Sequence, residues 1–132
     1  MTIKEVNALF NVSADTLRYY ERVGMIPPVT RSASGNRDYQ EIDLRWVDLA
    51  ICLRSAGLPV EILIDYVRLY QQGDDTIPAR LQLLKEQREA LIKQKNQIEA
   101  TLKRLDTKIE GYEIAIEPGE YPWHVKGGNE ND

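Results

Sequence analysis

One segment of the sequence carries side chains suited to binding DNA. If this segment is helical, Asp15, Arg18, Tyr19 and Arg22 share one face, because they follow an i, i+3, i+4, i+7 spacing. Arginine reads guanine edges or clamps phosphate, and a tyrosine hydroxyl typically meets phosphate. The spacing also describes a solvated charged face, which is common on helices, so both interpretations stay open. The opposite, packing side would hold Ala14, Leu17, Tyr20 and Glu21.

The other candidate for chemistry is Cys52, the only cysteine among 132 residues. A single thiol can be alkylated by an electrophile such as an aldehyde, or oxidised to a sulfenic acid or a mixed disulfide. Free cysteines are more often inert packing residues than sensors, and Cys52 lies on the polar flank of a predicted helix over about 41–56, so both roles remain open. The residues expected to face the core on that helix are Ile42, Trp46, Leu49 and Leu53.

The elements that position these residues begin with two short helices. Thr2, followed three residues later by Glu5, is a capping-box pattern that predicts the start of the first helix. Ser13 predicts the N-cap of the second, and Gly24 predicts its end. Two short helices joined by a turn of three or four residues are typical of a helix-turn-helix, here over about 3–23.

A turn-rich segment follows at about 28–40, where the sequence Ser-Ala-Ser-Gly-Asn predicts a small hairpin, or wing. Two further helices are predicted over about 41–56 and 59–72. We therefore expect a mainly α protein whose residues 1–72 form a winged helix-turn-helix domain, followed by a linker at 73–76.

Residues 77–116 carry an apolar seam whose positions step alternately by four and three. Such a sustained heptad pattern predicts a coiled coil, interrupted here by Arg88 and Lys95, which can set register or strand direction. A lone helix cannot bury this stripe, and about 60 Å of helix would outrun its own small domain. The seam therefore predicts a homodimer. Its apolar and aromatic members are Ile77, Leu81, Leu84, Leu91, Ile98, Leu102, Leu105, Ile109, Tyr112 and Ile116.

Composition restricts the remaining classes of function. The net charge is −4, but residues 1–40 carry five basic and four acidic side chains, whereas residues 110–132 carry one and six. A locally basic DNA-reading surface is therefore compatible with the overall acidity. One cysteine and one histidine, His124, give no expectation of a metal, a cofactor or a Cys–His enzyme site. We expect a cytoplasmic protein with no membrane segment and an acidic, disordered tail at 117–132.

Residues 2–72 resemble the MerR transcription regulators. The matching motifs are Arg18-Tyr19-Tyr20-Glu21 on the second helix, Gly35-Asn36-Arg37-Asp38-Tyr39 on the wing, and the turn Ala56-Gly57-Leu58. The resemblance implies an antiparallel coiled-coil homodimer that presents two winged domains to double-stranded promoter DNA. Regulators of this kind bend and untwist an overlong promoter spacer so that RNA polymerase can engage it. The resemblance also implies DNA contacts by Ser13, Thr16, Arg18, Tyr19, Arg37 and Tyr39, with Tyr20 mainly packing.

The effector is predicted from what the chain lacks. It has neither a large ligand domain nor the cysteines of the metal and iron–sulfur sensors, so it resembles the small thiol- and aldehyde-responsive subgroup, whose cysteine position Cys52 matches. The alternative is a regulator with another effector or none, in which Cys52 is structural. A coiled-coil adaptor whose first helices bind protein is a competing class. Salt-dependent binding to DNA distinguishes the regulator from the adaptor.

Overall fold

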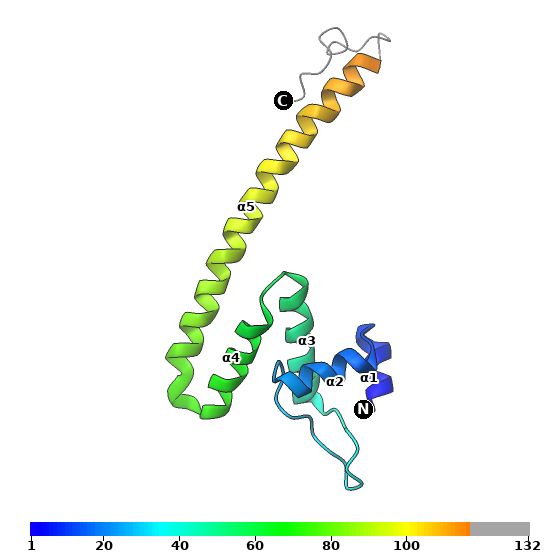
Figure 1. The fold of residues 1–132 in the computed structure, drawn as a ribbon, viewed down its shortest axis with the longest axis vertical. Coiled ribbons are helices and arrows are strands. Elements are labelled where there is room, and N and C mark those ends of the chain that lie inside the picture. Colours follow the sequence, from blue (N-terminus) through cyan, green and yellow to red (C-terminus); the bar gives the residue numbers. More distant parts are fainter. Residues whose placement is uncertain (117–132) are drawn as a thin grey trace. The chain divides into compact units, whose positions relative to one another are not determined.

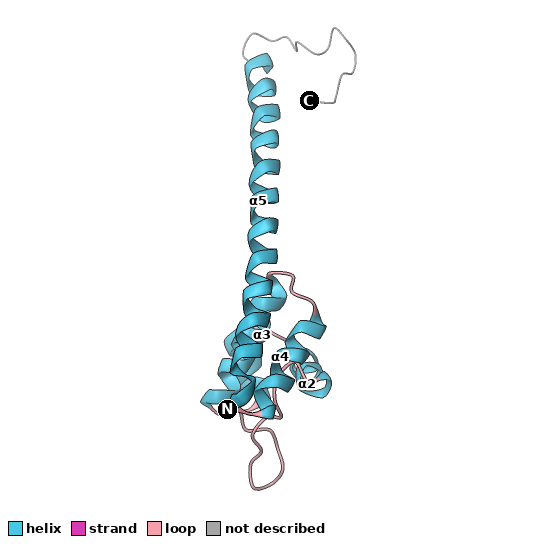
Figure 2. Cartoon of the chain, turned by 90° about the vertical axis from the view of Figure 1, so that its left-hand side faces the viewer, coloured by secondary structure: helices cyan, strands magenta, loops and turns pink. Residues whose placement is uncertain are grey.

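The structure, a computed structural model, describes residues 1–116; the predicted tail at 117–132 lies outside them. The described part is helical and contains no β-strand (Figures 1 and 2). It divides into a compact unit over Met1–Gln87 and a second unit that begins at Arg88. The elements are α1 (Ile3–Phe10), α2 (Ala14–Val23), α3 (Glu41–Ser55), α4 (Val60–Gln72), a 3-10 turn η1 (Asp74–Thr76) and α5 (Ile77–Ile116).

The first two helices begin where their capping residues predict. The Thr2 backbone N–H donates to Glu5 Oε1 at 2.8 Å, and the Glu5 N–H donates to Thr2 Oγ1 at 3.2 Å. The Thr16 N–H donates to Ser13 Oγ at 3.1 Å, which caps α2. Gly24 ends α2 with a φ of 88°, a left-handed conformation that costs glycine little. The predicted caps are confirmed.

The core of the first unit gathers apolar side chains from all four short helices and from the loop after α2. From α2 it takes Leu17, which is fully buried, and Tyr20, which is 9% exposed, as predicted for the packing side of that helix. The other buried members of this core are Val6, Met25, Ile26, Val29, Tyr39, Val47, Ala50 and Leu63.

The predicted core stripe of α3 is confirmed only in part. Trp46 and Leu53 are half-buried and pack against the core, and Trp46 also contacts α4, with its ring centroid 4.9 Å from that of Tyr70. Ile42 was predicted wrongly, because it is 52% exposed, and the fully buried residues of α3 are Val47 and Ala50. Apolar residues occur on two sides of α3 because it packs against more than one element, so hydrophobic spacing alone could not choose its rotation.

The wing is a hairpin without regular strands. Arg31 and Arg37 form an isolated antiparallel bridge, and the hairpin turn is closed by the Gly35 N–H, which donates to the Ser32 carbonyl at 2.9 Å. At the base of the hairpin the Asp38 N–H donates to the Thr30 carbonyl at 2.7 Å. This loop extends away from α1–α4 in Figures 1 and 2.

α5 is a single helix of 40 residues, as predicted, and its apolar seam is exposed to solvent. Ile98, Leu102, Leu105 and Ile109 are each 52–53% exposed. Burying a leucine side chain is worth about 1.5–3 kcal/mol, so a stripe of this length strongly favours a partner helix. Within the described residues, no helix is both long and apolar enough to span a membrane.

Replacing Leu102 and Leu105 together by glutamate is expected to abolish self-association. Each chain would put two charges into the seam, and we expect the dissociation constant of the dimer to rise at least about a hundredfold, which corresponds to about 2.7 kcal/mol. Light scattering after size-exclusion chromatography measures this change. Ile114→Glu is the matched control, because Ile114 is 60% exposed on the same helix but lies off the seam. A double variant that stays as associated as this control would contradict a seam-mediated dimer.

Candidate nucleic-acid interface

The face of α2 predicted to bind DNA is exposed. Asp15, Arg18, Tyr19 and Arg22 all reach solvent, because burial of the other side of α2 turns this face outward. Arg18 Nη1 pairs with Asp15 Oδ1 at 3.0 Å, and the Arg22 guanidinium carbon lies 5.4 Å from the centre of the Tyr19 ring. Two cations and one phenol are thus held on one short exposed surface.

Ser13 and Thr16 lie together at the start of α2, as predicted. Ser13 Oγ donates to Thr16 Oγ1 at 2.9 Å while it accepts the Thr16 N–H. The two hydroxyls therefore order the first turn of the helix. The N-terminal end of a helix carries partial positive charge and attracts phosphate, so this end is suited to a DNA backbone.

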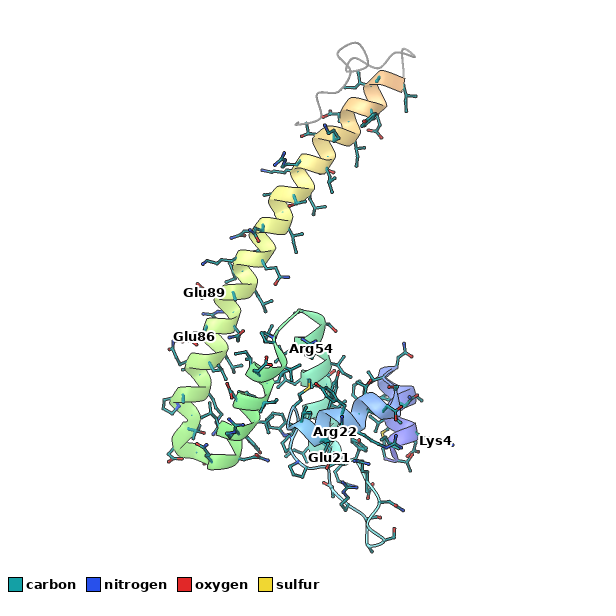
Figure 3. The ribbon with its side chains drawn as sticks, in the orientation of Figure 1. Lys4, Glu21, Arg22, Arg54, Glu86 and Glu89 are labelled. Atoms are coloured by element: carbon teal, nitrogen blue, oxygen red, sulfur yellow. The ribbon has the colours of Figure 1, made fainter. Side chains whose placement is uncertain are left out.

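A cleft of about 420 Å³ lies between the start of α1, α2 and the wing. All four charged residues that line it are basic: Lys4, Arg18, Arg31 and Arg37. They come from three separate segments, and Figure 3 labels Lys4 on α1. The sequence motifs predicted Arg18 and Arg37 but not Lys4 and Arg31, because no local pattern shows that these segments converge. A cleft whose charged lining residues are all cations favours a polyanion.

Glu21 connects α2 to the wing, although the sequence placed it only on the packing side. Its Oε1 accepts from Arg37 Nε at 2.7 Å, and its Oε2 accepts from the Val29 N–H at 2.8 Å. Partial burial raises the pKa of Glu21, but the Val29 and Arg37 hydrogen bonds and the charges of Arg37 and Arg31 outweigh it, so the net shift is downward. The carboxylate therefore stays ionised at neutral pH.

Tyr39 does not lie where its predicted role requires. Its side chain is 1% exposed and belongs to the core, and its hydroxyl has no hydrogen-bond partner within the described residues. Burial raises the pKa of Tyr39. A direct contact with phosphate needs an exposed hydroxyl, so the predicted contact is not supported in this conformation. The wing motif places Tyr39 at the base of the hairpin, where it packs beneath the DNA-facing side chains.

Cys52 is exposed on the last turn of α3. The cationic neighbours on its helix have other partners, since Arg45 pairs with Glu41 and Arg54 donates to the Leu58 carbonyl. No group of histidine, cysteine and acidic side chains suited to a metal ion occurs in the part of the chain that the structure describes. The site is therefore a single accessible thiol beside the turn that leads into α4.

Fold and surface together define a winged helix-turn-helix protein with a basic face suited to DNA, followed in the chain by a long helix. The sequence model of the MerR HTH family regulatory proteins matches residues 1–69, and the chain belongs to this family. The predicted family and fold class are thereby confirmed, as is the expectation of a DNA-binding transcriptional regulator rather than an enzyme.

Curated relatives agree with this assignment. The chain is 50% identical to the HTH-type transcriptional regulator AdhR of Bacillus subtilis over 92 residues, which are 70% of this chain and 66% of AdhR, just under two thirds of that protein. It is 34% identical to an uncharacterised HTH-type transcriptional regulator of Haemophilus influenzae, over 79% of this chain and 77% of that one.

Solved structures show the same fold. A MerR family transcriptional regulator from Listeria monocytogenes superposes with a TM-score of 0.86 at 44% identity, covering 90% of both chains. HiNmlR, a MerR family regulator lacking the sensor domain and bound to promoter DNA, superposes with a TM-score of 0.82 at 31% identity, covering 91% of this chain and 95% of HiNmlR.

Removing the Arg18 guanidinium tests the predicted recognition face. We expect Arg18→Ala to weaken binding to the DNA upstream of the protein's own gene about ten- to a hundredfold, because a bidentate arginine contact is worth about 1–3 kcal/mol. Fluorescence anisotropy at fixed salt measures the affinity. Arg45→Ala removes an equal charge from α3, where Arg45 is exposed and paired with Glu41. Equal affinities for the two variants would remove Arg18 from the interface.

Proposed function

We propose that this protein is a cytoplasmic homodimer that binds double-stranded promoter DNA and controls transcription by distorting it. The observation that carries the proposal is the basic cleft of Lys4, Arg18, Arg31 and Arg37 beside the exposed face of α2. A MerR relative of similar fold, HiNmlR, was solved bound to promoter DNA, which supports the same use of this surface.

The proposed contacts follow from the placement of each side chain. Arg18 and Tyr19 enter the major groove from the exposed face of α2, while Lys4, Arg31 and Arg37 hold phosphates at the cleft. Ser13 and Thr16 order the first turn of α2, so that the N-terminal end of the helix faces the DNA backbone. Tyr39 takes part only by supporting the wing from the core.

The polar residues of the seam favour an antiparallel dimer. If two copies of α5 pair in parallel and in register, Arg88 meets Arg88 and Lys95 meets Lys95, and like charges repel in the interface. If they pair antiparallel along the full seam, Arg88 lies opposite Leu105 and Lys95 opposite Ile98. Each cation then lies against an apolar residue and can extend its charged end to solvent. The antiparallel arrangement thus separates the two Arg88 side chains and places the two Lys95 side chains in adjacent layers rather than in the same one, which reduces the repulsion.

A dimer of this kind reads two half-sites whose separation is set by the protein. If the promoter places its half-sites or its polymerase elements at another spacing, binding must bend or untwist the DNA. The contact energy offsets that deformation, which makes affinity depend on DNA flexibility as well as on base contacts. We propose that the deformation realigns the promoter for RNA polymerase.

Salt titration tests the proposed DNA binding directly. We expect the logarithm of the binding constant to fall linearly with the logarithm of salt concentration, with a slope of about −0.9 for each phosphate contacted. Replacing Arg31 by alanine should make this slope about one unit shallower per protomer. Binding to upstream DNA that does not change with salt would contradict the phosphate contacts.

For the effector, we propose that Cys52 senses an aldehyde or another electrophile. The thiol is exposed at the turn between α3 and α4, and a relative at 50% identity carries the name AdhR. In the reaction with an aldehyde, the thiol loses its proton, sulfur bonds to the carbonyl carbon as the C=O π bond opens, and the resulting hydroxyl oxygen takes up a proton in place of the one that the thiol released. The added group enlarges the end of α3 and can shift the turn. The alternative is a regulator with another effector or none, in which Cys52 is structural.

The Cys52→Ala variant distinguishes a sensor role of Cys52 from a structural one. The variant is expected to bind operator DNA as tightly as the wild type, because Cys52 lies outside the proposed DNA interface, but to lose induction by an aldehyde or a thiol oxidant. A reporter fused to the upstream promoter measures induction, and intact-protein mass spectrometry measures the adduct. Full induction of the variant would exclude Cys52 as the sensor and support the alternative.

A further inference from the structure

The wing has few hydrogen bonds within itself. It holds one isolated bridge, Arg31 with Arg37, and short backbone hydrogen bonds around its turn. A two-stranded ribbon is marginally stable in water unless it packs on something else. The position of Arg31 and Arg37 therefore depends on what holds the base of the wing.

One side chain that holds the base of the wing is Glu21 on α2, whose carboxylate accepts hydrogen bonds from the wing. It accepts the Val29 N–H at 2.8 Å on the entering arm and Arg37 Nε at 2.7 Å on the returning arm, and Arg31 Nη2 lies 3.3 Å away. Its side chain is only 11% exposed. Figure 3 labels Glu21 at the end of α2 beside this loop. A single carboxylate thus joins both arms of the wing to the recognition helix.

The second side chain that holds the base of the wing is Asp43, which lies on α3. Asp43 is 6% exposed, and its Oδ2 accepts the Gln40 N–H at 2.8 Å. Its Oδ1 accepts the Thr30 N–H at 3.4 Å, a longer hydrogen bond to the entering arm than the 2.8 Å bond from the Val29 N–H to Glu21. The wing base is therefore held by two acidic side chains from two helices, and Glu21 makes the shorter hydrogen bond to the entering arm.

We propose that Glu21 is the positioning residue of the wing, an acidic side chain that strengthens binding to a polyanion. It holds Arg37 through Nε, which leaves the two Nη groups as donors for a phosphate. Asp43 supports the entering arm through the Thr30 N–H. The inference rests on the proposed function, because it assigns the wing arginines to the DNA backbone.

Charge and positioning predict opposite effects at this residue, which makes the proposal testable. By charge alone, removing a carboxylate next to two wing arginines makes the surface more basic and tightens binding to any DNA. By positioning, the loss of the carboxylate releases both arms and misplaces the arginines at the operator. The sign of the change in operator affinity therefore separates the two effects.

The experiment compares Glu21→Ala and Glu21→Gln with the wild type by anisotropy at fixed salt, on operator DNA and on an unrelated duplex. We expect Glu21→Ala to weaken operator binding at least about tenfold and to weaken binding to the unrelated duplex less, because the wing cations that remain still attract any DNA. Glu21→Gln should lose less, because its amide oxygen still accepts the Val29 N–H. Hydrogen exchange of the Val29 amide should accelerate in Glu21→Ala. Glu41→Gln is the matched control, because Glu41 is exposed and its ion pair with Arg45 lies within α3.

Operator binding by both Glu21 variants that equals or exceeds that of the wild type would overturn the proposal. Equal losses on operator and unrelated DNA would also overturn it, since they indicate general damage to the domain. If circular dichroism shows that Glu21→Ala does not fold, the test uses Glu21→Gln instead, and compares its affinities for operator and unrelated DNA with those of the wild type. If the wild type binds no DNA, the proposed function fails separately, and Val29 exchange still tests whether Glu21 holds the wing.

Discussion

The burial of Leu17 and Tyr20 fixes the rotation of α2 about its axis, and the DNA-binding surface depends on that rotation. A ten-residue helix can bury only one side, and these two residues lie against the core of the first unit. Arg18 and Tyr19, each next in sequence to a buried residue, must then face solvent. A rotation of one residue position would bury a guanidinium without a partner, which is strongly unfavourable. The hydrophobic effect thus orients the cations.

The binding surface is basic within an acidic protein. The net charge of −4 describes the whole chain, but the field near the wing is set by the side chains that line the cleft. The acidic groups close to that surface do not oppose its function, because Glu21 and Asp43 accept hydrogen bonds from the wing. The same carboxylate that lowers the local positive charge also determines where the remaining charge is presented.

The long helix contributes a different constraint. Its seam is apolar and exposed, so in the proposed function self-association and DNA recognition are served by separate parts of the chain. Arg88 and Lys95 weaken the seam, yet they penalise the parallel arrangement more than the antiparallel one. The two polar residues thus make the proposed dimer slightly less stable but favour one relative orientation of its two helices.

The sequence by itself determined the features that depend on neighbours along the chain. The caps at Thr2 and Ser13, the two faces of α2 and the seam of α5 follow from spacings of three or four residues, which a helix converts directly into contacts. Only the tertiary structure decided how segments distant in sequence meet. It buried Val47 and Ala50 of α3 rather than Ile42, buried Tyr39, and brought Lys4 and Arg31 to the cleft and Glu21 to the wing. Those outcomes depend on how the elements pack against one another, and the spacing of residues along the chain does not predict that packing.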